Sequence, residues 1–402
     1  MLPGGVAHPD PTMLVTQQPL LRKFWYPVIP AVMLRDGPRP FTLLGRDLVL
    51  WLDGTGAAVA MDDRCPHRHA RLSKGWILDG QLQCGYHGWT FNGEGRCTRI
   101  PQKDDDDPSG IAVPRYRTAQ RYGYVWVALE EPVADLPGVE EDTDPAFRRI
   151  YEFYEPWKCS GLRLMENSFD NAHFSFVHRN TFGKIDSPAP SKMNLYPFPD
   201  GLGFTMDTVV PVKNVALSMK SLNMTTAETV RNNTGTWWMP FFRKLRMRYP
   251  TGLVHTIVTA ATPISDHASQ IIQIAYRNDT EAEAKAADII AFDRAVVTED
   301  RDVLESTTFD TPVDLRRREE MHMASDQPGL LMRRQLMAQF QARGEEEAHG
   351  WGAPRGHAQA GEYGAHHPFA TEAMCLEMTY GGAAPAAPTA ATRREAAEEK
   401  RH

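Results

Sequence analysis

Short, strand-like apolar runs separated by frequent turns fill residues 41 to 129 of this chain. The pair Asp53-Gly54 lies between two such runs and is a hairpin signal, because both residue types tolerate the positive φ angles of a tight turn. Residues 122–129, Y-G-Y-V-W-V-A-L, predict the strand that closes this region. The pattern therefore predicts a small β-rich domain in the first third of the chain.

Strands and helices mix from about residue 152 onward. A helical segment comes first, residues 203–210 and 269–276 then have the apolar character of strands, and residues 281–307 predict a long helix. This order of elements predicts an α+β fold class. The apolar residues of the long helix recur at spacings that form one core-facing stripe, which contains Ile289, Phe292, Val296, Val303 and Leu304.

Composition restricts the class of protein. With 402 residues, of which 42% are hydrophobic, the chain can bury a core and is expected to form two domains. A net charge of −7 argues against a nucleic-acid partner. We expect no membrane association, because no apolar run approaches the roughly 18 residues of a membrane-spanning helix. We expect no signal peptide, because the N-terminus lacks a basic stretch followed by an apolar region. Of the five cysteines, Cys97, Cys159 and Cys375 lie outside the cysteine–histidine pairs described below. They are odd in number and lack the spacing of a disulfide framework, which predicts free thiols in a reducing cytoplasm.

Glycine, alanine, proline and charged residues dominate past about residue 344. Such a segment cannot bury enough apolar surface to order itself. We therefore expect an N-terminal segment at residues 1–23, a β-rich domain at 24–135, a mixed α and β domain at 136–343 and a disordered tail at 344–402.

Two cysteine–histidine pairs carry the most specific chemistry. Cys65-x-His67 is followed, after sixteen residues, by Cys84-x-x-His87. A Rieske 2Fe-2S cluster holds one iron by two cysteines and the other by two histidines, so each loop must supply one of each. A zinc site is the alternative, but zinc fingers pair cysteine with cysteine and histidine with histidine in each half. The spacing therefore predicts a 2Fe-2S cluster bound by these four residues.

A second group of metal-binding residue types follows about eighty residues later. His173 and His178 are candidates for two ligands of a mononuclear Fe(II), which non-haem iron oxygenases hold by two histidines and one carboxylate. Five residues turn a regular helix by about 500°, so both imidazoles can reach one iron only if the helix ends or bends between them. The alternative interpretation is an amphipathic helix with an incidental histidine and aspartate.

The carboxylate ligand is predicted on the long helix. Asp300 lies on its apolar stripe, where an acid is costly unless it is paired or bound to metal. Asp302 is predicted to point to the solvated side. Asp293, seven residues before Asp300 and on nearly the same face, remains the alternative ligand.

These motifs resemble the alpha subunits of Rieske non-haem iron oxygenases over about residues 22–340. The strings C-P-H-R-H-A-R-L and C-G-Y-H-G-W-T-F resemble the cluster loops, and N-x-x-D-x-x-H-x4-H resembles the iron motif. The segment E-D-x-x-V-L-E around Asp300 is similar to that of the monooxygenase members. The resemblance implies a helix-grip catalytic domain and a head-to-tail homotrimer. It also implies that Asp170 links His173 to a cluster histidine of the neighbouring subunit, and that Asn167 shapes the open iron site.

The resemblance implies an oxygenase that uses O2 to hydroxylate or demethylate a hydrophobic, cyclic organic substrate. No G-x-G-x-x-G motif is evident, so the expected electron donor is a separate ferredoxin or NAD(P)H-dependent reductase. The main alternative is a cis-dihydroxylating aromatic-ring dioxygenase. An electron carrier with only the cluster, or a scaffold with a degenerate site, is less consistent with the second set of ligand types.

Overall fold

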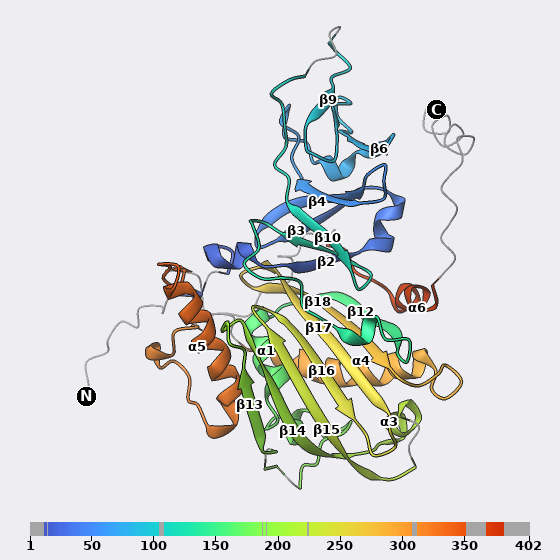
Figure 1. The fold of residues 1–402 in the computed structure, drawn as a ribbon, viewed down its shortest axis with the longest axis vertical. Helices are drawn as coiled ribbons and strands as arrows, with labels where there is room; N and C mark the ends of the chain where they lie inside the picture. The colour runs from blue at the N-terminus through green and yellow to red at the C-terminus, as the bar shows by residue number, and fades with distance from the viewer. Residues whose placement is uncertain are drawn as a thin grey trace.

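Two structural parts follow one another along the chain in the computed structural model (Figure 1). Three small sheets form the upper part of that view, and a large sheet with its helices forms the lower part. The described residues are 12–13, 15–103, 108–186, 188–189, 191–222, 225–307, 312–350 and 367–381. The predicted α+β class is confirmed, because the β-rich part precedes a part in which strands and helices mix.

The N-terminal part consists of three antiparallel sheets. The predicted hairpin at Asp53-Gly54 is present between β4 and β5 of the first sheet, and the predicted closing strand is β11 of the third. The first sheet contains β3 (Arg39–Leu43), β4 (Arg46–Leu52) and β5 (Ala58–Asp62). The second contains β6 (Trp76–Leu78), β7 (Gln81–Gln83), β8 (Thr90–Phe91) and β9 (Cys97–Arg99). The third contains β10 (Arg117–Arg121), β11 (Tyr124–Ala128) and β2 (Tyr26–Pro30).

A seven-stranded antiparallel sheet forms the frame of the second part. Its central strands are long, and the alternation of side chains gives it one face toward the helices and one toward the rest of the molecule. In spatial order it contains β12 (Arg148–Trp157), β18 (Ala268–Arg277), β17 (Val254–Ser265), β16 (Phe242–Arg248), β15 (Glu228–Trp238), β14 (Gly203–Lys213) and β13 (Met193–Pro197). A separate pair joins β1 (Thr12–Met13) to β19 (His349–Gly350).

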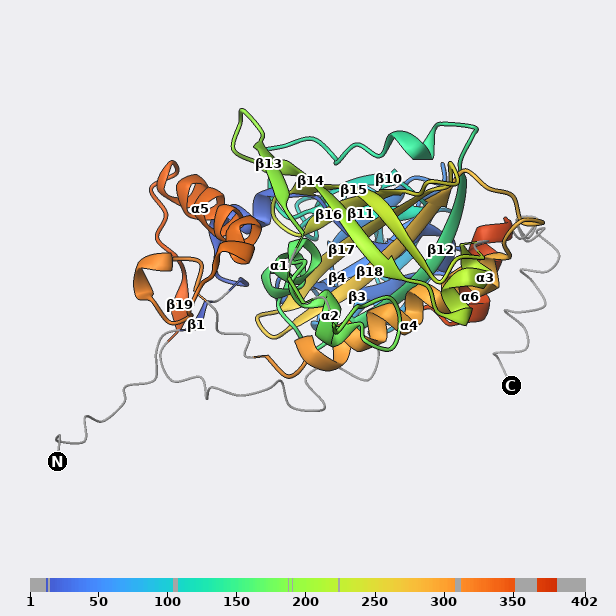
Figure 2. The same ribbon diagram turned by 90° about the horizontal axis from the view of Figure 1, so that it is seen from below.

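Helices cover one side of the large sheet (Figure 2). The long helix α4 crosses the sheet, and α1 and α2 lie beside it. The helices are α1 (Gly161–Phe169), α2 (Phe174–Val177), α3 (Ala216–Ser221), α4 (Ala286–Leu304), α5 (Gln327–Gln341) and α6 (Glu372–Tyr380). Short 3-10 helices span Pro19–Lys23, Ala31–Asp36, Leu72–Lys74, Glu140–Asp142, Leu315–Arg317 and Ala324–Asp326. No helix among the described residues combines the length and apolar character needed to cross a bilayer.

Two details of the sequence interpretation need correction. The apolar stripe of α4 is predicted to include Val303, but this residue is 44% exposed, whereas the next residue, Leu304, faces the core. The segment 344–402 was predicted to be disordered, yet α6 lies within it and packs beside β12. Cys375 of α6 is buried, and Met374 and Met378 pack against the main core, which supplies the apolar contact that composition alone did not suggest. Residues 351–366 and 382–402 of the predicted tail lie outside the described residues.

Candidate functional site

The two cysteine–histidine loops have the same backbone hydrogen bonds. In the first, the Cys65 N–H donates to the Ala70 carbonyl, and the amide four residues after the cysteine donates back to the Cys65 carbonyl. In the second, the Cys84 N–H donates to the Trp89 carbonyl, and the Gly88 N–H donates to the Cys84 carbonyl. The fourth residue after each cysteine has a positive φ, 59° at His69 and 75° at Gly88. Each loop therefore presents its cysteine and histidine in the same way.

The four side chains of these loops converge. The rings of His67 and His87 have centroids 4.4 Å apart, and Cys65 and Cys84 are both buried. Burial raises the pKa of the Cys65 thiol to about 11, and the neighbouring Cys84 thiol adds to this effect. The Nδ1 atom of His67 is buried without a hydrogen-bond partner. Two adjacent thiols and an unsatisfied imidazole fit the donor set of a 2Fe-2S cluster, which would bind the thiols as thiolates.

Helix α1 ends before both histidines of the second motif, and the short helix between them ends at His178, as the geometry requires. The hydroxyl of Ser160 caps α1 by accepting from the Arg163 N–H, and α1 ends at Asp170. The carboxylate of Asp170 accepts hydrogen bonds from the backbone N–H groups of Ala172 (2.7 Å) and His173 (3.2 Å) and so starts the next helical turn. The short helix α2 then separates His173 from His178.

His173, His178 and Asp300 meet at one point. The Nε2 atoms of the two histidines are 3.2 Å apart, and the Oδ1 atom of Asp300 lies 3.5 Å from the first and 3.3 Å from the second. The side chain of Asn167 donates to the same oxygen at 3.0 Å. Two imidazole nitrogens and a carboxylate oxygen that face one another could hold a single metal ion.

The position of Asp293 separates it from this group. Asp293 and Asp300 are seven residues apart on α4 and line the same cavity, as the shared helix face predicts. Their positions differ by about 10 Å along the helix axis at 1.5 Å per residue. Asp293 is instead buried against His255, with 3.2 Å between its Oδ2 atom and the imidazole Nε2 atom. The exposed Asp302 points away from the cavity.

Each candidate histidine ligand has its own carboxylate partner. The Nδ1 atom of His173 is 3.1 Å from Asp170, and the Nδ1 atom of His178 is 3.1 Å from Glu299. Thr181 donates to the same oxygen of Glu299 at 2.7 Å. A carboxylate on the second ring nitrogen fixes the tautomer and orientation of an imidazole whose Nε2 atom faces a metal.

Hydrogen bonds keep the two aspartates ionised. Burial pushes the pKa of Asp300 upward, but the hydrogen bond from His178, the charges of both histidines and the amide of Asn167 hold it below its usual value. Burial also raises the pKa of Asp170. The contacts with His173 and with two backbone N–H groups outweigh this effect and hold the pKa below its usual value. The carboxylate of Asp300 is therefore available as an anionic ligand.

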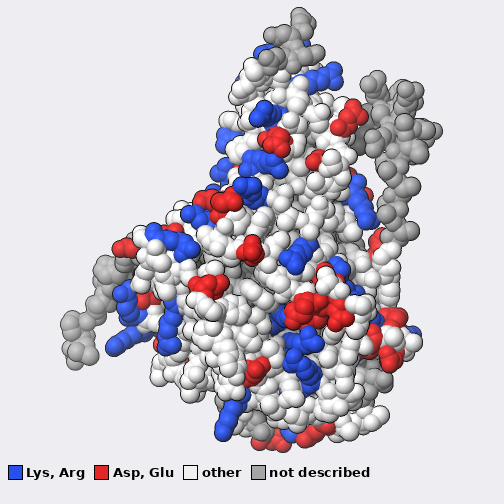
Figure 3. Space-filling model, viewed as in Figure 1, with Lys and Arg blue, Asp and Glu red and all other residues white. Residues whose placement is uncertain are grey.

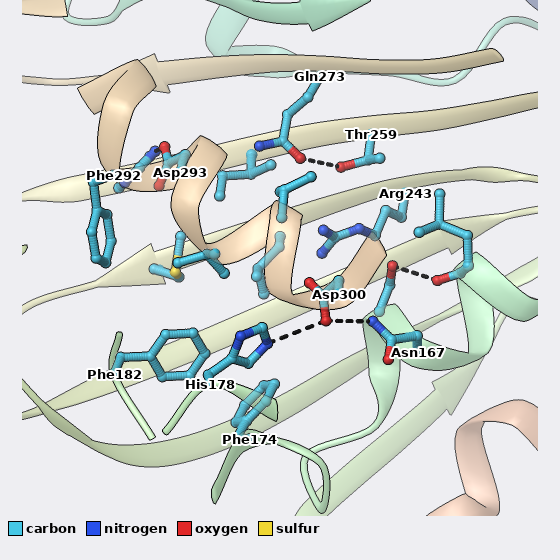
Figure 4. Close-up of a pocket in the computed structure, with 18 of the residues that line it drawn as sticks. Asn167, Phe174, His178, Phe182, Arg243, Thr259, Gln273, Phe292, Asp293 and Asp300 are labelled. Carbon is cyan, nitrogen blue, oxygen red and sulfur yellow. Dashed lines mark hydrogen bonds and ion pairs between the residues drawn. The ribbon is translucent and has the colours of Figure 1, made fainter. Parts of the chain in front are cut away.

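The three candidate ligands line one end of a cavity between α4, α1 and the sheet (Figure 4). In the close-up Asp300 lies between His178 and Asn167, while Gln273 and Thr259 lie on the strands behind α4. Aromatic and aliphatic side chains form much of the wall, including Phe153, Trp157, Phe174, Phe182, Ile271 and Phe292. A largely apolar cavity that ends at a possible metal site is suited to an organic substrate.

Sequence interpretation assigned no role to Glu299, although it directly precedes Asp300. Adjacent residues on a helix differ by about 100° in direction, so one can face a metal site while the other faces the back of a ligand. The feature of the sequence that could have indicated this role is the pair of consecutive acids, Glu299 and Asp300. Only the approach of α2 to α4 shows which histidine Glu299 contacts.

We expect Glu299→Gln to weaken retention of the mononuclear iron by about 10–100-fold, because an amide cannot orient the His178 imidazole as a carboxylate does. Iron content after dialysis against a graded chelator measures the effect. The exposed Asp302→Asn on the same helix is the control for loss of one negative charge. Equal iron retention in the two variants would contradict the role given to Glu299.

Comparison with known proteins agrees with both sites. Residues 24–117 match the Rieske [2Fe-2S] domain, and residues 157–342 match the vanillate O-demethylase oxygenase C-terminal domain. Methylxanthine N1-demethylase NdmA of Pseudomonas putida is 28% identical over 327 residues, 79% of this chain and 88% of that protein. Chloroplastic pheophorbide a oxygenase of Oryza sativa subsp. japonica is 41% identical over 197 residues, 43% of this chain and 36% of that protein.

A solved structure extends the agreement. The structure of Pseudomonas putida CBB5 NdmA with caffeine has a TM-score of 0.71 at 25% identity, and the match covers 85% of this chain and all of that one. The chain belongs to the Rieske non-haem iron oxygenases, and its relatives identify it as a member of their monooxygenase branch. The cofactors of this family are a 2Fe-2S cluster and a mononuclear iron, for which the two groups of residues have the right donors.

Proposed function

We propose that this enzyme hydroxylates or demethylates a hydrophobic, cyclic substrate at the site formed by His173, His178 and Asp300. The observation that carries the proposal is that these three side chains meet at the end of an aromatic-lined cavity. When bound, the cluster would supply electrons one at a time, and the mononuclear iron would provide the site at which O2 is reduced. The protein contributes ligands, orientation and exclusion of water.

We assign the cluster to Cys65, His67, Cys84 and His87 in a Rieske domain of residues 24–135, and the mononuclear iron to a catalytic domain of residues 136–343. Asn167 holds Asp300 by its hydrogen bond and borders the cavity, which supports a role in shaping the open side of the iron site. The three cysteines outside the cluster, Cys97, Cys159 and Cys375, are free thiols, which supports a reducing, cytoplasmic location.

We further propose that the enzyme works as a homotrimer in which electrons pass between subunits through Asp170. Figure 1 draws β6 and β9, the edge strands of the sheet whose β7–β8 connection is the second cluster loop, at one end of the molecule and α1 and α4 in the other part. The side chain of Asp170 is 30% exposed and borders a cleft lined by residues of α1, α4 and α5. From this position it contacts His173 and remains accessible to a neighbouring chain.

The electron donor in this proposal is a separate ferredoxin or NAD(P)H-dependent reductase. Over the face drawn in Figure 3, acidic and basic side chains are interspersed among uncharged ones. The face gives no reason to choose one sign of charge for the docking partner, so a surrogate donor is the practical choice for the assay.

Product mass tests the reaction. Purified enzyme with a surrogate reductase should add one oxygen atom to a cyclic substrate or remove one methyl group. A methyl group on oxygen or nitrogen that is hydroxylated leaves as formaldehyde, while the second atom of O2 leaves as water after two electrons and two protons are consumed. Formaldehyde in proportion to O2 therefore identifies demethylation. Products with two added hydroxyl groups would instead assign the enzyme as a dihydroxylating dioxygenase.

A further inference from the structure

An arginine lines the cavity that ends at the candidate iron site. Arg243 lies on β16 between register partners Trp237 of β15 and Thr259 of β17. Residues alternate between the two faces of a strand, so Arg243 shares a face with Leu245 and Met247, which also line the cavity. Figure 4 shows its guanidinium directed into the cavity near Asp300.

Arg243 has no ion-pair partner among the described residues. Its Nε atom is buried without a hydrogen-bond partner, and no carboxylate forms an ion pair with its guanidinium. The cations on the opposite face of the same strand differ, because Lys244 pairs with Glu140 and Arg246 pairs with Glu141 at 2.9 Å. The Arg243 side chain is only partly exposed, and a guanidinium that loses part of its water without gaining an anion is energetically unfavourable.

Of the other charged groups of the cavity, the two aspartates are engaged by hydrogen bonds or ion pairs, whereas Arg231 also has a buried Nε atom without a hydrogen-bond partner. The guanidinium of Arg231 lies over the ring of Phe182, 4.6 Å from its centroid. Asp293 faces His255, and Asp300 faces the two candidate histidine ligands and accepts from Asn167. Burial lowers the pKa of Arg243 to about 10, and the charge of Asp300 opposes part of this change, so the side chain stays a cation at neutral pH.

We propose that Arg243 binds the carboxylate of the substrate, so that this enzyme acts on cyclic organic acids. The planar fork of a guanidinium matches the two oxygens of a carboxylate, and the apolar wall of the cavity accommodates the ring. The acid group would be held at Arg243 while another part of the molecule faces His173, His178 and Asp300. This inference rests on the proposed function, since it names the class of substrate for that site.

Paired acids and amides of the same shape test the inference. The probes are benzoate, 3-methoxybenzoate and cyclohexanecarboxylate, each compared with its carboxamide, and binding to the iron-loaded protein is measured by calorimetry. We expect the wild-type protein to prefer at least one acid over its amide by about tenfold or more, as a charge-assisted contact provides. Arg243→Gln should abolish the preference, and Arg243→Lys should keep part of it.

Arg248→Gln is the matched control, because Arg248 lies on the opposite face of the same strand and is itself exposed. It should leave the preference unchanged. A wild-type protein that prefers no acid in any pair would overturn the inference, as would Arg243→Gln that loses acid and amide binding equally. If Arg243→Gln lowers iron content while the acid preference persists, Arg243 supports Asp300 instead.

Failure of this inference is distinguishable from failure of the proposed function. Product formation by the wild-type enzyme tests the function with neutral as well as acidic cyclic substrates. Turnover of neutral substrates only would leave the oxygenase function intact and remove the role of Arg243. Absence of product from every substrate, with both metals loaded and a competent reductase, would count against the function itself.

Discussion

Asp300→Ala should remove the mononuclear iron and lower product formation by more than about a hundredfold, while the visible absorption of the 2Fe-2S cluster stays unchanged. Asp300 provides the carboxylate oxygen that faces both imidazole Nε2 atoms, and no other described carboxylate lies within the same group. Alanine leaves only the two histidines, which cannot complete a two-histidine, one-carboxylate site. Iron analysis and product assay measure the two effects separately.

Two aspartates on the same helix are controls for this substitution. Asp302→Ala removes an exposed acid and should keep iron and activity. Asp293→Asn alters the buried pair with His255 and should keep the mononuclear iron, although the wall of the cavity changes. Retention of iron by Asp300→Ala together with its loss from Asp293→Asn would transfer the ligand to Asp293.

Mixing two inactive variants should restore activity if electrons cross between subunits. Cys84→Ser chains lack the cluster but keep the mononuclear iron, because a serine hydroxyl does not replace the thiolate ligand. Asp300→Ala chains keep the cluster and lack the mononuclear iron. In trimers assembled from equal amounts, about one quarter of the directed contacts pair an intact cluster with an intact iron. Activity of that order is expected after the two are refolded or expressed together.

The complementation needs proof that mixed trimers form, which different affinity tags on the two chains provide. Asp170→Asn tests the contact itself, since both metal sites remain and only the carboxylate between the histidines is lost. This variant should bind both metals and turn over at least about tenfold more slowly. Fully inactive mixed trimers, or normal turnover by Asp170→Asn, would exclude the proposed route between subunits.

The parts of the site that the sequence predicted are those whose ligands are close together in the chain. Cys65 and His67 share one loop, Cys84 and His87 share another, and spacing alone limits what such loops can bind. The end of α2 at His178 was also foreseeable, because two histidines five residues apart do not share a face of a continuous helix. The hydrophobic pattern was sufficient to predict α4 and the long strands of the sheet.

The contacts that the sequence did not predict depend on packing between distant elements. Glu299 reaches His178 across 121 residues of chain, and the direction of Arg243 follows from the register of β16 within a seven-stranded sheet. Asp293 and Asp300 share a helix face, so only the position of α2 distinguishes them. The helix α6 was not predicted, because short helices depend on tertiary contacts for most of their stability, and the local sequence does not show those contacts.

The position of α6 has a consequence for solubility. β12 is an edge strand of the large sheet, and an edge with free backbone groups is a template for pairing with another chain. Here the Ala370 N–H donates to the Tyr154 carbonyl at 2.9 Å, and the hydroxyl of Thr379 accepts from the Tyr151 N–H at 2.9 Å. The segment from Ala370 to Thr379 therefore occupies the hydrogen-bonding side of β12. A segment in this position hinders the pairing of β12 with a strand of another chain.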